Sequence, residues 1–170
     1  MVKPQQPVPM LDLPLVGGDR WSIIDQEPEA FTLMVFYRGF HCPVCRGYLK
    51  QLQSLQPDLK EIGVSSVVAV SGDDHERAAA AVEGWELTDL PVAYGQTVDS
   101  MREWGLFVSK GLNEGEPALF GEPGLFLIKA DGTLYTSVVN SMPFGRPHLE
   151  EIVGAIRWTT DNGYPARGEA

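Results

Sequence analysis

The stretch that decides the fold reads Phe36-Tyr-Arg-Gly-Phe-His-Cys-Pro-Val-Cys-Arg-Gly-Tyr-Leu49. It contains both cysteines of the chain, Cys42 and Cys45, three positions apart. A continuous apolar run, residues 31–37, precedes the pair and has the length and the side chains of a buried central strand. An apolar stripe at helical spacing follows it. The two cysteines are therefore predicted at the junction between a buried strand and a helix.

The helix after the cysteines is predicted from six apolar positions spaced by four, four, three, four and three: Val44, Tyr48, Leu52, Leu55, Leu59 and Ile62. Pro43 suits the first turn of this helix. Pro57 has no N–H to donate, so we expect it to kink or divide the helix, and Gly63 ends it. Residues 64–71 form a second buried strand. The unit 31–71 is then a right-handed strand–helix–strand crossover with parallel strands.

This placement puts Cys42 at the carboxyl end of a central strand, the edge where ligands of open α/β sheets gather. The helix start supplies unpaired N–H groups that stabilise a thiolate, and Arg38, His41 and Arg46 are close enough to add positive potential. We therefore expect Cys42 to be an exposed nucleophile and Cys45, one turn inside the helix, to be the resolving thiol.

Other interpretations of these residues are open. The two cysteines could be buried and inert, or half of a zinc ribbon, although the chain lacks the second pair of ligands that zinc needs. His41 either tunes the thiol pKa and shuttles a proton or is a partly buried ring with no catalytic part. The acidic run Asp73-Asp74-His75-Glu76 resembles a metal cluster, but its place before a helix favours capping. We expect no metal site.

The composition of the 170 residues, 44% of them hydrophobic, predicts one domain over 1–170 with a loose arm at 1–9 and a loose tail at 163–170. Thirteen Lys and Arg against 23 Asp and Glu give a net charge of −10, which argues against nucleic acid as a partner. No apolar run approaches the roughly 18 residues of a membrane span, and the first residues do not resemble a signal peptide. We expect a cytoplasmic protein that does not enter a membrane.

The remaining elements follow from alternation and turn signals. We expect a hairpin over residues 11–24, helices at 74–84, 98–105 and 147–160, and a hairpin over 125–139 that turns at Asp131-Gly132. Residues 107–123 are too polar for a core element and too long for a simple connection. We predict that they form a mobile loop bordering Cys42.

The segment "FYRGFHCPVC" resembles the "FYRG-x-WCP-x-C" signature of the peroxiredoxin-like AhpC/TSA group within the thioredoxin-like superfamily. The segments "LDLPLVGGDRWSI" and "PGLFLIKADGTLY" resemble its N-terminal and late hairpins, so the resemblance spans about residues 10–158. It implies a thioredoxin-like three-layer α/β sandwich. Its mixed central sheet would have flanking helices and an N-terminal hairpin extension.

The resemblance also implies a thiol-disulfide redox enzyme that reduces hydroperoxides or disulfides, with Cys42 as nucleophile and Cys45 as resolving thiol. Such chemistry needs no metal, flavin or haem cofactor. The electrons would come from an external thiol donor, thioredoxin- or glutathione-like, and the family hints at a homodimer. A rival interpretation is a redox-regulated binding or scaffold module in which the dithiol switches a surface without turnover.

The chain departs from the peroxiredoxin pattern at three positions. Val35 and Gly39 stand where Pro-x-x-x-Thr-x-x-Cys has its Pro and Thr. Pro123 stands where peroxiredoxins have an arginine and thioredoxins a cis-proline. We therefore predict a cis Glu122–Pro123 bond with Pro123 packed against the cysteine pair. Arg38 is then the nearest donor for polarising a peroxide.

Overall fold

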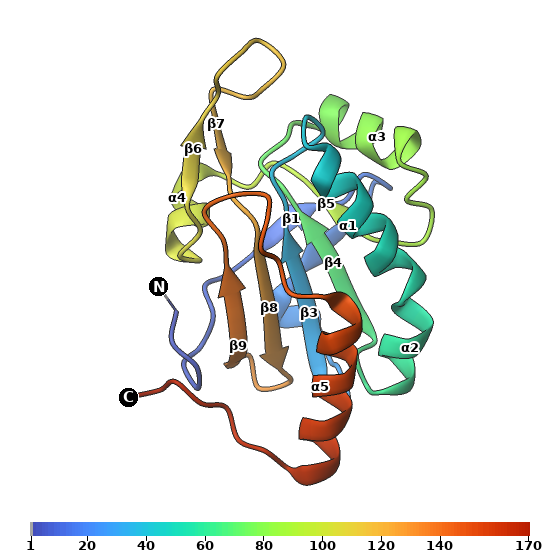
Figure 1. Cartoon of the computed structure of the whole chain (residues 1–170), viewed down its shortest axis with the longest axis vertical. Coiled ribbons are helices and arrows are strands. Elements are labelled where there is room, and N and C mark those ends of the chain that lie inside the picture. The colour runs from blue at the N-terminus through green and yellow to red at the C-terminus, as the bar shows by residue number, and fades with distance from the viewer. Residues whose placement is uncertain (1) are drawn as a thin grey trace.

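The computed structural model describes residues 2–170, so Met1 of the expected arm lies outside the described residues. Its centre is a five-stranded sheet in the order β5-β4-β3-β8-β9 (Figure 1). The strands of this sheet are β3 (Phe31–Phe36), β4 (Ser66–Val70), β5 (Val92–Ala93), β8 (Gly124–Lys129) and β9 (Leu134–Val139). Two hairpins complete the strands: β1 (Asp12–Pro14) with β2 (Arg20–Ser22), and β6 (Val108–Lys110) with β7 (Leu119–Gly121). The helices are η1 (Ile23–Asp25), α1 (Pro43–Ser54), α2 (Gln56–Glu61), α3 (His75–Gly84), α4 (Val98–Glu103) and α5 (Leu149–Asn162).

The strand directions decide which loops meet the cysteines. The predicted strand–helix–strand unit is confirmed, because β3 and β4 pair in parallel. The late hairpin is confirmed as well, since β8 pairs antiparallel with both β3 and β9. Strand β9 therefore runs in the direction of β3. The carboxyl ends of β3, β4 and β9 lie at one edge of the sheet, and the loops that follow them converge there.

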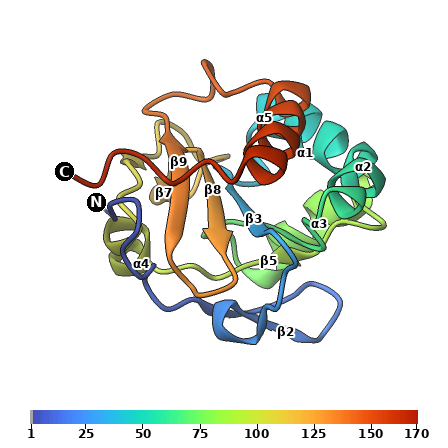
Figure 2. The same ribbon diagram turned by 90° about the horizontal axis from the view of Figure 1, so that it is seen from below.

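Alternation along β3 divides the apolar core into two halves. Leu33 and Val35 belong to a cluster with buried residues of α1, α2, α3 and α5, whereas Met34 and Phe36 pack with the β1–β2 hairpin and α4. Figure 2 shows the same division, with α1, α2, α3 and α5 on one side of the sheet. Both faces of β3 are thus covered, which explains why its sequence is continuously apolar. The predicted three-layer sandwich with a mixed sheet and an N-terminal hairpin is confirmed.

The predicted division of the long helix at its proline is also confirmed. Helix α1 ends at Ser54, and α2 begins at Gln56 with Pro57 in its first turn, where the missing N–H costs nothing. The expected stripe is wrong at its first position: Val44 is exposed, and Leu49 is buried instead. No helix among residues 2–170 is long and apolar enough to cross a membrane.

Both ends of the chain make hydrogen bonds with other parts of the molecule. Gln5 N–H donates to the Leu134 carbonyl and Leu134 N–H to that of Gln6, so the arm extends the pairing of β9. The tail packs onto the arm: Gln5 Nε2 donates to the Ala166 carbonyl, and Ala166 is buried. These contacts form because the free edge of β9 supplies backbone partners, and the looseness of the arm and the tail stays a prediction.

Candidate active site

Cys42 begins α1 as its N-cap residue. Its Sγ accepts a hydrogen bond from the Cys45 N–H at 3.3 Å, and Pro43 fills the first helical position. The Cys42 N–H donates to the Gly39 carbonyl at 3.1 Å, which tightens the turn before the helix. Both cysteines are free thiols. The first sulfur therefore occupies the position at which a helix N-terminus stabilises an anion.

The sulfur atoms are less accessible than the sequence suggested. Cys42 is only 2% exposed and Cys45 is fully buried. Both belong to the core cluster beneath α1, together with Val35 of β3 and Tyr37, which directly follows β3. The expectation of an exposed Cys42 is wrong, because the turn after β3 folds the residue inward as the helix begins. A substrate reaches this sulfur only if it is small or if the surrounding loops open.

The two thiols have pKa values shifted in opposite directions. The pKa of Cys42 is lowered, first by a hydrogen bond from the Cys45 thiol, with further contributions from the Cys45 N–H, Arg146 and Arg38. The pKa of Cys45 is raised, chiefly by burial and then by its hydrogen bond to Cys42. Cys42 is therefore the more acidic of the two thiols, and Cys45 keeps its proton to higher pH.

Arg38 is held beside the site by a buried acid and an aromatic ring. Its Nε lies 3.3 Å from Glu122 Oε2, and its guanidinium lies 4.7 Å from the centre of the Phe120 ring. Glu122 is itself 2% exposed and accepts a hydrogen bond from Ser109 Oγ at 2.6 Å through its other oxygen. The guanidinium is thus positioned before any substrate arrives.

His41 does not supply positive charge to the site. Burial and the neighbouring Arg38 lower the pKa of its imidazole, so the ring is neutral near pH 7. The ring packs edge-on against Phe120 at 4.7 Å, and neither nitrogen has a hydrogen-bond partner among the described residues. Arg46 is exposed on α1, where its charge acts on Glu86. The positive potential at Cys42 therefore comes from Arg38 and from Arg146, which was not among the residues expected at the site.

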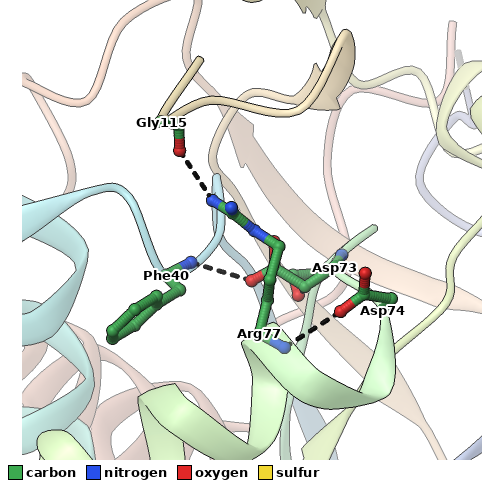
Figure 3. Close-up of polar contacts among 6 residues, drawn as sticks. Phe40, Asp73, Asp74, Arg77 and Gly115 are labelled. Carbon is green, nitrogen blue, oxygen red and sulfur yellow. Dashed lines mark hydrogen bonds and ion pairs between the residues drawn. The ribbon is translucent and has the colours of Figure 1, made fainter.

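Gly39 and Asp73 account for one departure from the peroxiredoxin signature. Gly39 has φ +128°, and a Cβ built there would lie 2.6 Å from Asp73 Oδ1. Asp73 is 2% exposed, and its Oδ2 accepts the Phe40 N–H at 2.8 Å, as Figure 3 shows. The carboxylate thus occupies the space that a threonine side chain at position 39 would need. The predicted capping role belongs to Asp74, whose Oδ1 accepts the Arg77 N–H at 2.9 Å.

Arg77 links this carboxylate to the β6–β7 hairpin. Its Nε donates to Asp73 Oδ1 at 3.2 Å, and its Nη2 donates to the Gly115 carbonyl at 2.9 Å (Figure 3). Residues 107–123 were expected to form a loop, but they contain the paired strands β6 and β7. Phe120 and Glu122 border the site through Arg38 and His41, as expected of this segment. Its mobility stays a prediction.

Arg146 lies between β9 and α5 and contacts Cys45. Its Nη2 donates to Cys45 Sγ at 2.9 Å, and its guanidinium lies 4.9 Å from the centre of the Tyr48 ring. A signal for this residue was present in the sequence. Strand β8 runs antiparallel to β3, and β9 runs antiparallel to β8, so the chain leaves β9 at the edge of the sheet where Cys42 lies. A polar residue soon after β9 is therefore expected at that edge.

The prediction for Pro123 is wrong in its geometry. The Glu122–Pro123 bond is trans. The backbone on both sides of it is extended and paired: Glu122 N–H donates to the Phe107 carbonyl at 2.8 Å, and Asn140 N–H donates to that of Pro123 at 2.9 Å. Pro123 therefore continues the chain from β7 into β8, and the structural argument for thioredoxin-like disulfide exchange at this position is lost.

A small cavity lies at Arg146, and neither cysteine lines it. It measures about 10 Å³ and is lined by residues that include Tyr48, Pro123, Asn140 and Arg146. This volume matches about one water-sized molecule. The described residues, 2–170, contain no group of three or more His, Cys, Asp or Glu side chains placed to hold a metal ion. The arrangement is thus a buried dithiol between two guanidinium groups, suited to nucleophilic attack on a small molecule.

Comparison with known proteins identifies a matching family. The sequence profile of the AhpC/TSA family matches residues 4–137, which include both cysteines. No curated protein that was compared matches the chain.

Solved structures are similar in fold at low sequence identity. Peroxidoxin BcpB from Mycobacterium tuberculosis is 19% identical, with 93% of this chain and 98% of that chain covered and a TM-score of 0.74. The C45S mutant of peroxiredoxin 6 from Arenicola marina is 17% identical, with 96% and 76% covered and a TM-score of 0.82. Reduced Prx3 from Vibrio vulnificus in complex with H2O2 is 18% identical, with 92% and 99% covered and a TM-score of 0.76.

Proposed function

Because the chain belongs to the AhpC/TSA family of thiol-dependent oxidoreductases, we propose that it is a peroxidase in which Cys42 reduces small hydroperoxides. One observation carries the proposal. The Cys42 sulfur caps α1, accepts the Cys45 N–H, and has its pKa lowered by the hydrogen bond from the Cys45 thiol and by Arg146 and Arg38. A thiolate is the form of cysteine that attacks a peroxide.

The reaction balances with the two cysteines and one external donor. The Cys42 thiolate attacks one peroxide oxygen, the O–O bond breaks, and the other oxygen leaves as an alcohol or water after taking a proton. Cys42 is then a sulfenic acid. The Cys45 thiol gives up its proton and attacks that sulfur, the expelled hydroxide takes up a proton and leaves as water, and a Cys42–Cys45 disulfide forms. Two equivalents of an external thiol, or one dithiol, reduce the disulfide and are themselves oxidised to a disulfide.

The burial and the backbone of the site favour a peroxide over a protein disulfide. Cys42 is only 2% exposed, so a small molecule reaches its sulfur more readily than a disulfide of a folded protein does. The trans bond at Pro123 also removes the feature expected of a site that exchanges disulfides with an extended peptide. Hydrogen peroxide is bound in the similar Vibrio vulnificus Prx3 structure, which makes it the first substrate to test.

The test is stopped-flow oxidation of the reduced protein by hydrogen peroxide, with Cys42→Ser and Cys45→Ser as variants. We expect oxidation well above the rate of free cysteine, no reaction in Cys42→Ser, and a trapped Cys42 sulfenic acid in Cys45→Ser. A rate like that of free cysteine, combined with efficient reduction of insulin, would replace the peroxidase by a disulfide reductase. Failure in both assays would leave the redox-regulated binding module.

The partners follow from the same chemistry. We expect a thioredoxin-like or glutathione-like donor, a cytoplasmic setting that keeps both thiols reduced, and a homodimer of the kind the family suggests. Coupled assays with each donor distinguish the first two candidates, and sedimentation equilibrium of the reduced and oxidised protein determines the oligomeric state.

A further inference from the structure

Arg146 contacts Cys45 directly. The Nη2–Sγ distance of 2.9 Å joins the guanidinium to the deeper of the two sulfur atoms. Its Nε and Nη1 are also buried, and neither has a hydrogen-bond partner among the described residues. Two donors and one positive charge are therefore available beside Cys45 beyond the bond already made.

The side chain is held in place by its neighbours. The Tyr48 ring supports the guanidinium at 4.9 Å, and Tyr48 Oη donates to the Pro147 carbonyl at 2.9 Å. On the other side, Asn140 Nδ2 donates to the Gly145 carbonyl at 2.9 Å. Residues on both sides of Arg146 are thus anchored, so the guanidinium does not have to be ordered during the reaction.

We propose that Arg146 is a positioning residue for Cys45, whose guanidinium stabilises the Cys45 thiolate in disulfide formation and in disulfide reduction. The inference rests on the proposed peroxidase function and assigns its second step. When Cys45 attacks the Cys42 sulfenic acid, the S–S bond forms and the S–O bond breaks. When an external thiolate attacks the Cys42 sulfur, the S–S bond breaks and Cys45 leaves as a thiolate. Both steps place negative charge on the atom that Arg146 contacts.

The surroundings of Cys45 explain why it needs such a group. Cys45 is fully buried, and burial raises its pKa above that of an ordinary thiol. The titratable or charged groups that act on it are Cys42, which raises its pKa further, Arg146, which lowers it, and Tyr37, whose own pKa is raised by Cys45. Among these, Arg146 alone favours the thiolate.

Arg38 provides a contrast within the same site. It is paired with Glu122 and lowers the pKa of Cys42, and it is not among the main causes of the shift in the pKa of Cys45. Arg146 lowers the pKa of both thiols, but of the two arginines it is the one that donates a hydrogen bond to Cys45, the sulfur that closes the disulfide.

The test separates the two steps by rapid quench after one equivalent of hydrogen peroxide. Dimedone traps the sulfenic acid, and alkylation with mass spectrometry counts the disulfide. In Arg146→Met we expect disulfide formation to slow at least 10-fold more than sulfenic acid formation, with partial recovery in Arg146→Lys. In Arg38→Met we expect the reverse: slower sulfenic acid formation and unchanged closure. Arg102→Met, an exposed arginine of α4, is the matched control and should change neither step.

The outcomes distinguish this inference from the proposed function. If the unaltered protein forms no sulfenic acid, the peroxidase proposal fails. If it forms the disulfide normally but Arg146→Met slows both steps equally, or only the first, Arg146 serves Cys42 and this inference fails. Should Arg146→Met not fold, Arg146→Lys and Tyr48→Phe are judged by the same ratio of the two rates.

Discussion

The two ends of the central sheet differ in the volume of the cavity and in the reactive groups that lie there. Near the start of β3, a cavity of about 520 Å³ is lined by residues that include Phe31, Tyr135 and Thr160, and neither cysteine lies there. At the carboxyl end of β3 the cavity is about 10 Å³, yet this end has the dithiol. It also has two buried carboxylates, Asp73 and Glu122. The reactive end of the sheet is thus marked by charged groups held in fixed positions. The volume of a cavity does not indicate which end is reactive.

The largest expected effect tests this comparison directly. Cys42→Ser removes the nucleophile, so peroxide consumption should fall at least about 1,000-fold, measured by a peroxide electrode with excess thiol donor. Thr160→Val, at the large cavity, should leave the rate unchanged. A loss of activity in Thr160→Val would show that the large cavity near the start of β3 takes part in the reaction.

The next prediction concerns the close packing at the reactive end. Gly39→Ala should lower the free energy of unfolding by about 2–3 kcal/mol, because the added Cβ meets the Asp73 carboxylate at a strained φ of +128°. Gly47→Ala, on the exposed side of α1 with nothing within 4 Å, should instead raise it by about 0.5–1 kcal/mol. Urea unfolding of both reduced variants measures the difference, and effects of the same sign would contradict it.

A smaller effect is expected in the pH dependence of sulfenic acid formation. The lowered pKa of Cys42 keeps the thiolate at neutral pH, so the rate falls only as pH drops through that lowered value. Arg38→Met removes a positive charge and leaves Glu122 unpaired. Both changes raise the pKa of Cys42, so the midpoint should move upward by about 0.5–1 pH unit. Stopped-flow profiles from pH 4 to 9 check this, with Arg102→Met as control; an unmoved midpoint would remove Arg38 from the site.

The smallest effect concerns Asp73. Burial raises its pKa above the unfolded value of about 3.9, so the folded state binds a proton that the unfolded state has lost. The stabilising contribution is present below pH 4 and is lost as pH rises through the raised pKa. Asp73→Asn should abolish this loss, about 1 kcal/mol or less, whereas Asp74→Asn, an equally good N-cap, should retain it. Parallel stability curves for the unaltered protein and Asp73→Asn between pH 4 and 7 would contradict the prediction.

The predictable part of the site is the part encoded locally. The junction of a buried strand with Pro43 and an apolar stripe is enough to place Cys42 at a helix start, and this prediction was confirmed. The predictions that failed concern contacts between distant segments. The exposure of Cys42 and the geometry of Pro123 both depend on which backbone groups are free to pair once the sheet has assembled.

Periodicity and breakers in the sequence by themselves determined the central strands, the divided helix, the hairpins and the dithiol at the sheet edge. These features arise from interactions within a few residues of chain. Only the tertiary structure decided that Arg146 reaches Cys45 across 101 positions and that Asp73 replaces a side chain at position 39 across 34. Such pairings depend on strand order and direction, because the antiparallel return of β8 and β9 brings the late loop to the edge where α1 begins.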